Sequence, residues 1–190
     1  MRAVIYKIVI NLVPILRGFI MSIVYRTIRR NVHINIKSRI KGYTEWILNP
    51  GCVFYSDEGF LVGKFTTMNV AKNGILTIGK NVGIGNRCQI VCHKHIEIGD
   101  GTIFGPSVLI YDHNHLFDFD KGVNQRQFVS DDIIIGKHCW IGAGCIILKG
   151  VTIGDNCLIG AGSIVTKDIP SGSMAVGSPA HIIKSKNGTT

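Results

Sequence analysis

Two histidines close together in a charged segment are the residues best suited to do chemistry in this sequence. His113 and His115 lie in an Asp-His-Asn-His run that begins at Asp112, within the stretch YDHNHLFDFDKGVNQRQFVSDDI from Tyr111 to Ile133. Histidine is the side chain best poised to accept a proton near neutral pH. A lone histidine in a polar loop is most often merely solvated. This pair, in the one long interruption of an otherwise strict repeat, predicts a functional site with a histidine base.

The segment after this stretch is a strict six-residue repeat. From position 135 it reads IGKHCW IGAGCI ILKGVT IGDNCL IGAGSI V, five units with an aliphatic residue first and a small or β-branched residue fifth. A period of six fits neither the 3.6 of a helix nor the 2 of a strand. It fits a solenoid in which each unit forms one face, so the sequence predicts a β-helix. The repeated aliphatic positions are Ile135, Ile141, Ile147, Ile153, Ile159 and Val165.

The repeat also indicates how the chain is divided. Its register begins at Ile78 and reaches Ile110 after a slip of two residues around His93-Lys94-His95. Between positions 31 and 72 the period is ragged, as expected of the coils that cap a solenoid. We therefore expect a helical segment over 1–30, a β-helix over 31–168 with a protruding loop at about 111–133, and a C-terminal crossing segment and tail over 169–190.

The formal net charge of +9 belongs to the N-terminus. Nine basic residues lie within the first 41 positions, no acid precedes Glu45, and the remaining chain has 12 basic and 12 acidic residues. The repeat body therefore lacks the basic surface expected of a protein that binds nucleic acid.

Residues 1–30 are apolar and basic, and we expect one or two helices, kinked or interrupted near Pro14. Lys7 and Arg17 cut the apolar runs below the ~20 residues that a membrane span needs, and no signal-peptide cleavage site is found. The composition suits the surface of an anionic bilayer. Packing on the end of the solenoid or between subunits is the alternative, and the two can coexist.

The six cysteines do not indicate disulfides or a metal site. Four of them, Cys88, Cys139, Cys145 and Cys157, occupy the small inward slot and are expected to be buried and poor nucleophiles. No paired CxxC pattern for zinc is present, and no spacing brings a third histidine to the loop pair. We expect no metal, and a reduced, cytoplasmic protein whose residues 1–30 would bind the inner face of the plasma membrane.

From position 75 to about 185 the sequence resembles the hexapeptide-repeat acyltransferases, in the branch of the xenobiotic, galactoside, maltose and polysaccharide O-acetyltransferases. The resemblance joins the repeat, the histidine-bearing loop, the Trp-Ile-Gly unit at Trp140 and the Thr-Lys-Asp-Ile-Pro…Gly-Ser-Pro-Ala ending that starts at Thr166, in that order. It implies a left-handed parallel β-helix and a homotrimer with active sites between subunits. It also implies acetyl-CoA as the donor, bound in the groove between neighbouring coils.

The resemblance further implies roles for single residues. His113 matches the general base of the family, and Trp140 matches an aromatic residue beside the reaction centre. Ala143 and Ala161 match positions whose backbone meets the pantetheine arm. Two more, Thr166 and Lys167, match a pair near the adenosine and phosphate end of the cofactor.

Two departures from the family pattern concern the ligands. Where galactoside-type enzymes carry arginines for the 3′-phosphate of CoA, this chain has His181 and Lys184. Where they carry an Asn and an Asp for the acceptor, it has Gly85 and His93, so we expect a different sugar. The residues expected to orient the base or line the acceptor side are Asp112, His115, His93 and Trp140.

These features predict direct acetyl transfer without an acyl-enzyme. Neutral His113 would remove the proton from an acceptor hydroxyl as that oxygen attacks the thioester, and Asp112 or a main-chain carbonyl would orient the imidazole. The expected acceptor is a membrane-associated saccharide precursor of a surface polysaccharide. Alternatives are an acetyltransferase for a soluble antibiotic, free sugar or amino sugar, and, from another class, a scaffold trimer or a β-helix metalloprotein of carbonic-anhydrase type.

Overall fold

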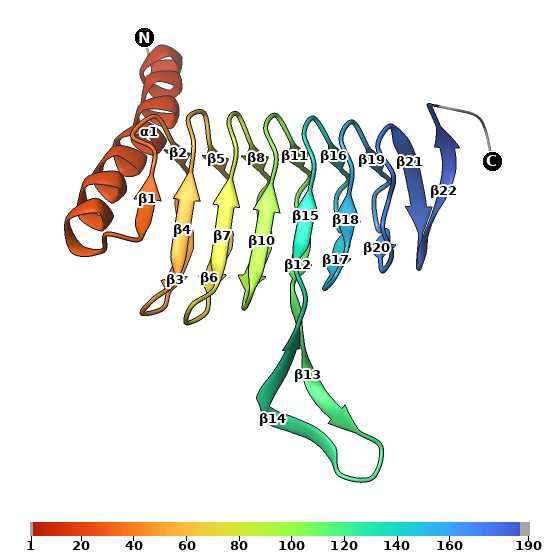
Figure 1. The fold of residues 1–190 in the computed structure, drawn as a ribbon. Coiled ribbons are helices and arrows are strands. Elements are labelled where there is room, and N and C mark those ends of the chain that lie inside the picture. Colours follow the sequence, from red (N-terminus) through yellow and green to blue (C-terminus); the bar gives the residue numbers. More distant parts are fainter. Residues whose placement is uncertain (1, 187–190) are drawn as a thin grey trace.

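The protein consists of one N-terminal helix, a stack of β-coils and a hairpin that projects from the middle of the stack (Figure 1). The computed structural model describes residues 2–186, with side chains from Leu12 onward. Residue 1 and residues 187–190 lie at the ends of the predicted terminal segments and are outside the described residues.

Each coil contributes a short strand to each of three sheets, and the strands within a sheet are parallel except for the last pair of sheet B. This arrangement confirms the predicted parallel β-helix. Sheet A contains β1 (Val32–Ile34), β4 (Val53–Ser56), β7 (Ile75–Ile78), β10 (His95–Ile98), β15 (Ile133–Ile135) and β18 (Thr152–Ile153). Sheet B contains β2 (Arg39–Ile40), β5 (Leu61–Val62), β8 (Gly83–Ile84), β11 (Ile103–Phe104), β16 (Trp140–Ile141), β19 (Leu158–Ile159), β21 (Ser173–Gly177) and β22 (Ala180–Ser185). Sheet C contains β3 (Glu45–Leu48), β6 (Thr67–Val70), β9 (Gln89–Cys92), β12 (Leu109–Tyr111), β17 (Ile146–Leu148) and β20 (Ile164–Val165).

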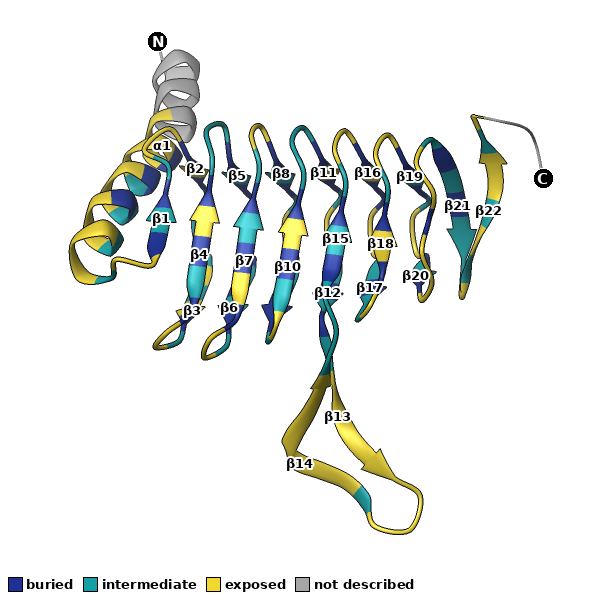
Figure 2. Cartoon of the chain, in the orientation of Figure 1, coloured by how far each residue is buried: buried dark blue, intermediate teal, exposed yellow. Residues whose placement is uncertain are grey.

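The core is a column of inward side chains that repeats in every coil, seen as dark bands along the strands (Figure 2). All six aliphatic positions predicted from the repeat are buried, as are the four cysteines predicted to fill the small slot. Because each coil stacks the same apolar groups on those of the next, the hydrophobic effect specifies the register of every strand at once.

The ragged N-terminal part of the repeat is a regular solenoid with longer coils. Val32 pairs with Phe54, and Phe54 pairs with Leu76, so these coils are 22 residues long. In the C-terminal part, Ile147 pairs with Val165 after 18 residues, which is three units of six. The steps from sheet A to sheet B and on to sheet C remain six residues long, as at Ile78, Ile84 and Ile90. The extra residues lie between sheet C and sheet A, where strands such as β6 and β7 have four residues each. A single period of six therefore does not describe these coils.

The hairpin consists of β13 (His113–Asp118) and β14 (Gly122–Ser130), which pair antiparallel with an irregularity between His115 and Leu116. It occupies the stretch that interrupts the repeat. The chain leaves the solenoid at Asp112 and returns at Asp131, whose backbone N–H donates to the carbonyl of Asp112 at 2.9 Å. The two ends of the hairpin are therefore tied together at one corner of the solenoid.

The helix α1 (Arg2–Ile28) runs through Pro14 without a break, so of the kink or interruption expected there, the interruption does not occur. Pro14 and Gly18 lie on a buried face that packs on the first coil, where α1 contacts β1 and β2. Pro14 has no backbone N–H, so one carbonyl in the preceding turn lacks its helical hydrogen bond. The packing of α1 on the first coil compensates for this loss. No helix within the described residues combines the length and apolarity needed to cross a bilayer.

A methyl group at Gly18 should weaken the docking of α1. A Cβ built there would lie 2.0 Å from the carbonyl oxygen of Ser38, which is backbone of the first coil. We expect Gly18→Ala to destabilise the protein by about 2 kcal/mol despite the better helix propensity of alanine. The measurement is thermal unfolding followed by circular dichroism.

Gly83→Ala is the matched control. The added Cβ would meet the Cγ2 atom of Ile103 at 3.6 Å, which is ordinary van der Waals contact. This variant should unfold near the wild-type temperature. Equal midpoints for the two variants would contradict close packing of α1 on Ser38.

Candidate functional site

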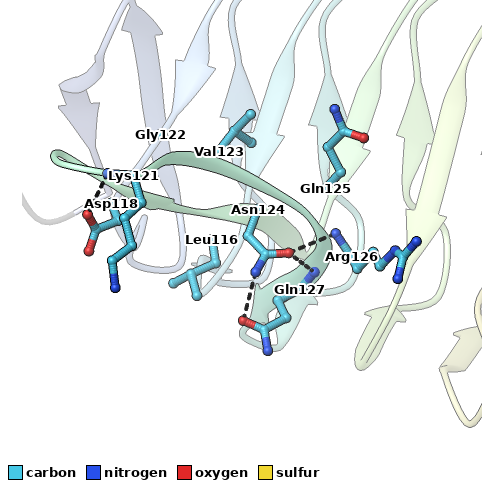
Figure 3. Close-up of a pocket in the computed structure, with 9 residues that line it drawn as sticks. All are labelled: Leu116, Asp118, Lys121, Gly122, Val123, Asn124, Gln125, Arg126 and Gln127. Carbon is cyan, nitrogen blue, oxygen red and sulfur yellow. Dashed lines mark hydrogen bonds between the residues drawn. The ribbon is translucent and has the colours of Figure 1, made fainter.

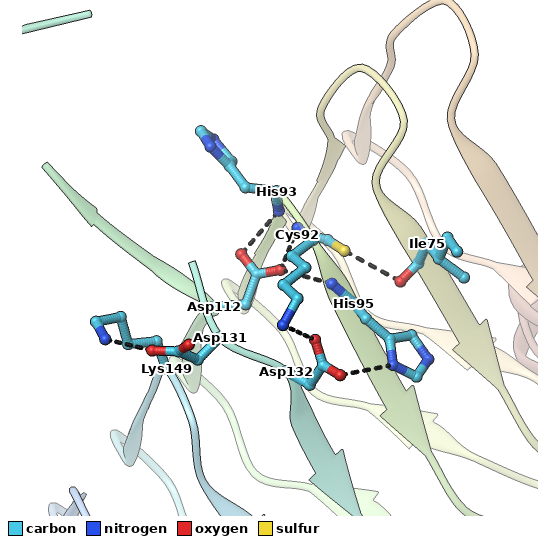
Figure 4. A network of polar contacts seen from close by, with 9 residues as sticks. Ile75, Cys92, His93, His95, Asp112, Asp131, Asp132 and Lys149 are labelled. Atoms are coloured by element: carbon cyan, nitrogen blue, oxygen red, sulfur yellow. Dashed lines mark hydrogen bonds and ion pairs between the residues drawn. The ribbon is translucent and has the colours of Figure 1, made fainter. Parts of the chain in front are cut away.

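The site is organised around Asp112, a fully buried carboxylate at the corner where the hairpin leaves the solenoid (Figure 4). Its Oδ1 accepts the backbone N–H of His93 at 2.7 Å, and its Oδ2 accepts those of Lys94 at 2.7 Å and His95 at 3.1 Å. These hydrogen bonds satisfy a buried charge that would otherwise be costly. Asp112 thereby fixes the start of the hairpin against the preceding coil.

His113, the predicted base, is held directly beside this carboxylate. Its Nδ1 lies 3.3 Å from Asp112 Oδ1, and its side chain is 14% exposed. The ring of His93 stacks on that of His113 with centroids 3.6 Å apart and planes 9° apart. The ring of Phe128 stands edge-on to both imidazoles, at 4.5 Å from His93 and 5.4 Å from His113. The position and plane of the His113 ring are therefore set on several sides.

This arrangement suits a general base. A carboxylate can only accept, so Nδ1 of a neutral His113 carries the proton and donates a hydrogen bond to Asp112 Oδ1. The lone pair is then on Nε2, and within residues 2–186 no hydrogen bond engages that nitrogen. An imidazole with one nitrogen fixed by a carboxylate and the other open can take a proton from a bound hydroxyl.

The other histidines of the cluster have different surroundings. Burial, and next the adjacent His113, lower the pKa of His93, which favours its neutral form. His115 lies farther out on the hairpin, with Nδ1 at 3.2 Å from the carbonyl oxygen of Asn124 and its ring tilted against Phe128. The structure therefore groups Asp112, His113, His93 and His115 along one corner.

Two ion pairs join the hairpin to the coils on either side of it. Lys94 Nζ lies 2.9 Å from Asp132 Oδ1, and Lys149 Nζ lies 2.5 Å from Asp131 Oδ2. The hydrogen bond from Lys149 lowers the pKa of Asp131, and the one to Asp132 raises the pKa of Lys94. Both pairs are partly exposed, so each adds little to the stability of the fold, and their contribution is to orient the base of the hairpin.

Within one chain, the fold does not bring three of the predicted site residues next to His113: Trp140, Ala143 and Ala161. Trp140 is on β16 in sheet B, 55% exposed, and pairs in register with Ile103 and Leu158. Ala143 and Ala161 are exposed in the turns that lead from sheet B to sheet C. The carbonyl of Ala143 already accepts the N–H of Gly162 at 2.8 Å.

Three of the residues matched to the cofactor line one hollow near the C-terminal end. Thr166, Lys167 and His181 surround a space of about 540 Å³ together with the Ser178-Pro179 segment. Lys184 lines a different hollow with Asn156 and Leu158. A single chain therefore brings together the Thr-Lys pair and His181, but not Lys184.

A further hollow, of about 540 Å³, lies along the hairpin and contains none of the predicted site residues (Figure 3). It is lined mainly by polar side chains of β14, among them Asn124, whose Oδ1 accepts the backbone N–H groups of Arg126 and Gln127. Phe128, which covers the histidine cluster, is not predicted from the sequence. It is an apolar residue within a polar strand, which could have drawn attention to it. The pairing of β13 and β14 is irregular after His115, however, so the sequence alone does not indicate which residues lie opposite Phe128.

All six cysteines are free and buried. Burial raises the pKa of Cys88 and Cys145, whereas a hydrogen bond with Cys139 lowers the pKa of Cys157. Within the described part of the chain, no three His, Cys, Asp or Glu side chains are grouped so as to hold a metal ion. His93 and His113 face each other with their ring planes rather than pointing nitrogens at a common position.

Comparisons with known proteins agree with the fold. A family model, the hexapeptide repeat of succinyl-transferase, matches residues 132–167. The chain is 44% identical over 139 residues to Nodulation protein L of Rhizobium meliloti (strain 1021), covering 71% of this chain and 68% of that protein. It is 52% identical over 107 residues to Nodulation protein L of Rhizobium leguminosarum bv. viciae, covering 56% of each. The match thus spans little more than half the length of the second relative.

Solved structures similar to the chain include two acyltransferases. A maltose O-acetyltransferase from Clostridium difficile 630 has a TM-score of 0.53 and 29% identity, covering 90% of this chain and 87% of that chain. AntD, an N-acyltransferase from Bacillus cereus in complex with dTDP and coenzyme A, has a TM-score of 0.65 and 18% identity, covering 78% of this chain and 80% of that chain. The second likeness shows the fold alone.

The half-buried, stacked state of His93 predicts a pH-dependent stability. The pKa of His93 is lower in the folded protein, so the unfolded chain binds the proton more readily. Acidification through the ordinary histidine range, at about pH 6.5, should therefore lower the melting temperature of the protein. His93→Phe keeps a stacking ring without the titrating nitrogens. Its melting temperature should fall less over the same range, and an unchanged slope would contradict the role given to His93.

Proposed function

Because the chain belongs to the hexapeptide-repeat acyltransferase family, we propose that it transfers an acetyl group from acetyl-CoA to a hydroxyl of a saccharide. The observation that carries this proposal is His113, held by the buried Asp112 through Nδ1 and open at Nε2. This is the arrangement that removal of a hydroxyl proton requires.

The proposed reaction is a direct transfer. Nε2 of His113 takes the proton of the acceptor hydroxyl while that oxygen forms a bond to the thioester carbonyl carbon. The carbon–sulfur bond then breaks, and the CoA thiolate leaves and takes up the proton. Asp112 keeps Nδ1 protonated and stabilises the imidazolium that forms between these steps. The buried cysteines take no part, since no acyl-enzyme is needed.

We propose that the cofactor binds with its adenosine and phosphate end near Thr166, Lys167 and His181. The shared hollow supports this placement, because a lysine and a histidine there can meet phosphate groups. The pantetheine arm would then run past the backbone at Ala161 and Ala143 toward the reaction centre.

A homotrimer would complete this site. Trp140 and His113 lie on different faces of one chain, so a Trp140 side chain beside the base would come from a neighbouring copy. The apolar side chains exposed on the hairpin, such as Phe117 and Phe119, give such a copy a surface to pack on.

The acceptor we propose is a membrane-associated saccharide precursor of a surface polysaccharide. The resemblance to sugar O-acetyltransferases supports the hydroxyl as the group acetylated, and His93 in place of the acceptor-binding acid of the galactoside enzymes supports a different sugar. A soluble sugar or amino sugar is the alternative. An alkali-stable acetyl group in the product would indicate an amino sugar instead.

Removing the base should abolish turnover without harming the fold. We expect His113→Ala to lower the rate of acetyl transfer by about 10²–10⁴-fold, because the acceptor hydroxyl keeps its proton. The test is product formation from labelled acetyl-CoA with a panel of saccharides, alongside CoA binding by calorimetry. Near-normal turnover with intact CoA binding would end the assignment of His113.

Lys167 offers a second test, with Lys184 as the matched control. Both lysines are exposed, but only Lys167 lines the hollow with Thr166 and His181. We expect Lys167→Ala to weaken CoA binding by about fivefold to tenfold through loss of a phosphate contact, and Lys184→Ala to leave it near the wild-type value. The opposite order would move the cofactor to the other hollow.

A further inference from the structure

We infer that the exposed side of α1 docks on an anionic lipid bilayer. This side, the lipid face, consists of large apolar side chains that point away from the solenoid: Leu12, Val13, Ile15, Leu16, Phe19, Ile20, Ile23, Val24 and Ile28. The inference deepens the proposed function by naming the surface that would bring the protein to a membrane-bound acceptor. The inference rests on the proposed function only for the biological purpose of docking, because binding to lipid can be measured without acetyl transfer.

The lipid face lies opposite the side by which α1 packs on the protein. Pro14, Gly18 and Ser22 follow one another at intervals of four and are buried, so they form one stripe along the helix. Met21 and Tyr25 flank this stripe and pack against the core. The helix is therefore already fixed to the solenoid by one side, and its apolar residues on the other side cover nothing among the residues that the structure describes.

An exposed apolar surface of this size calls for a partner. Side chains 12 to 28 extend over about 24 Å of helix, and contiguous apolar patches on soluble proteins mark interaction sites. A helix of this kind with no acidic residue suits the plane of a membrane interface, where its apolar side enters the boundary between headgroups and acyl chains. It does not need to cross the bilayer.

The charge around α1 favours lipid over a second copy of the chain. Arg26 and Arg30 are exposed at the C-terminal end of the helix, and the first acid of the chain is Glu45. Anionic headgroups attract such a surface, whereas two copies facing each other there would bring like charges together.

The position of α1 leaves the candidate site free. The helix covers the N-terminal end of the solenoid, β22 lies at the opposite end, and the hairpin projects from the middle (Figure 1). A bilayer beneath the lipid face therefore leaves His113 and the hollow at Lys167 outside the contact.

The test is flotation of the full-length protein with vesicles of phosphatidylcholine, with and without phosphatidylglycerol. We expect the wild type to float with the anionic vesicles and to float less as salt is added. Ile23→Glu places a charge on the lipid face and should lower the bound fraction by about tenfold or more. Ile183→Glu, on β22 at the other end of the solenoid, is the matched control and should float like the wild type.

Each result separates this inference from the proposed function. Wild type that stays with the soluble fraction, or Ile23→Glu that floats like wild type, would overturn the docking surface. A wild-type oligomer that does not float but dissociates in Ile23→Glu would overturn it in favour of contact between copies. Acetyl transfer to a soluble saccharide should be equal in all three proteins, and its absence from all three would count against the proposed function alone.

Discussion

The buried carboxylate of Asp112 is the constraint on which the candidate site depends. A charge that is fully removed from water is tolerated only where hydrogen bonds replace its hydration. Three consecutive backbone N–H groups, from His93 to His95, supply those bonds, and the carbonyl of the same residue holds Asp131 at the other end of the hairpin. His113 is the next residue along the chain, so fixing Asp112 also fixes where the imidazole of His113 lies.

The rest of the molecule supplies stiffness and spacing. Each coil stacks its aliphatic and cysteine side chains on those of the next, which leaves the interior without room for a ligand. Chemistry is therefore confined to the surface of the solenoid and to the hairpin. The two ends of the stack differ as well, with α1 at one end and the Lys167 hollow near the other. Such a rod can hold a membrane contact and a cofactor apart.

The sequence predicts the repeating coils and the position of the histidine base, but not the contacts that the hairpin makes with it. Every sixth residue from Ile135 to Val165 predicted a β-helix because an inward point recurs with each face. The 22-residue coils were expected only as ragged capping coils, because four extra residues between sheet C and sheet A break the period of six. His113 was found because it interrupts the repeat, and Asp112 beside it was named as one of two candidates to orient it. Phe128 was missed because it is 15 residues away, and only the hairpin pairing brings it over the imidazoles.

The central claim is that Asp112 fixes His113 as a base with its lone pair on Nε2. Nitrogen-15 NMR of the histidine side chains in the wild-type protein, assigned with a variant that lacks His113, measures this directly. We expect neutral His113 to be protonated at Nδ1 and unprotonated at Nε2. A His113 protonated at Nε2, with its lone pair on Nδ1 beside Asp112, would contradict it.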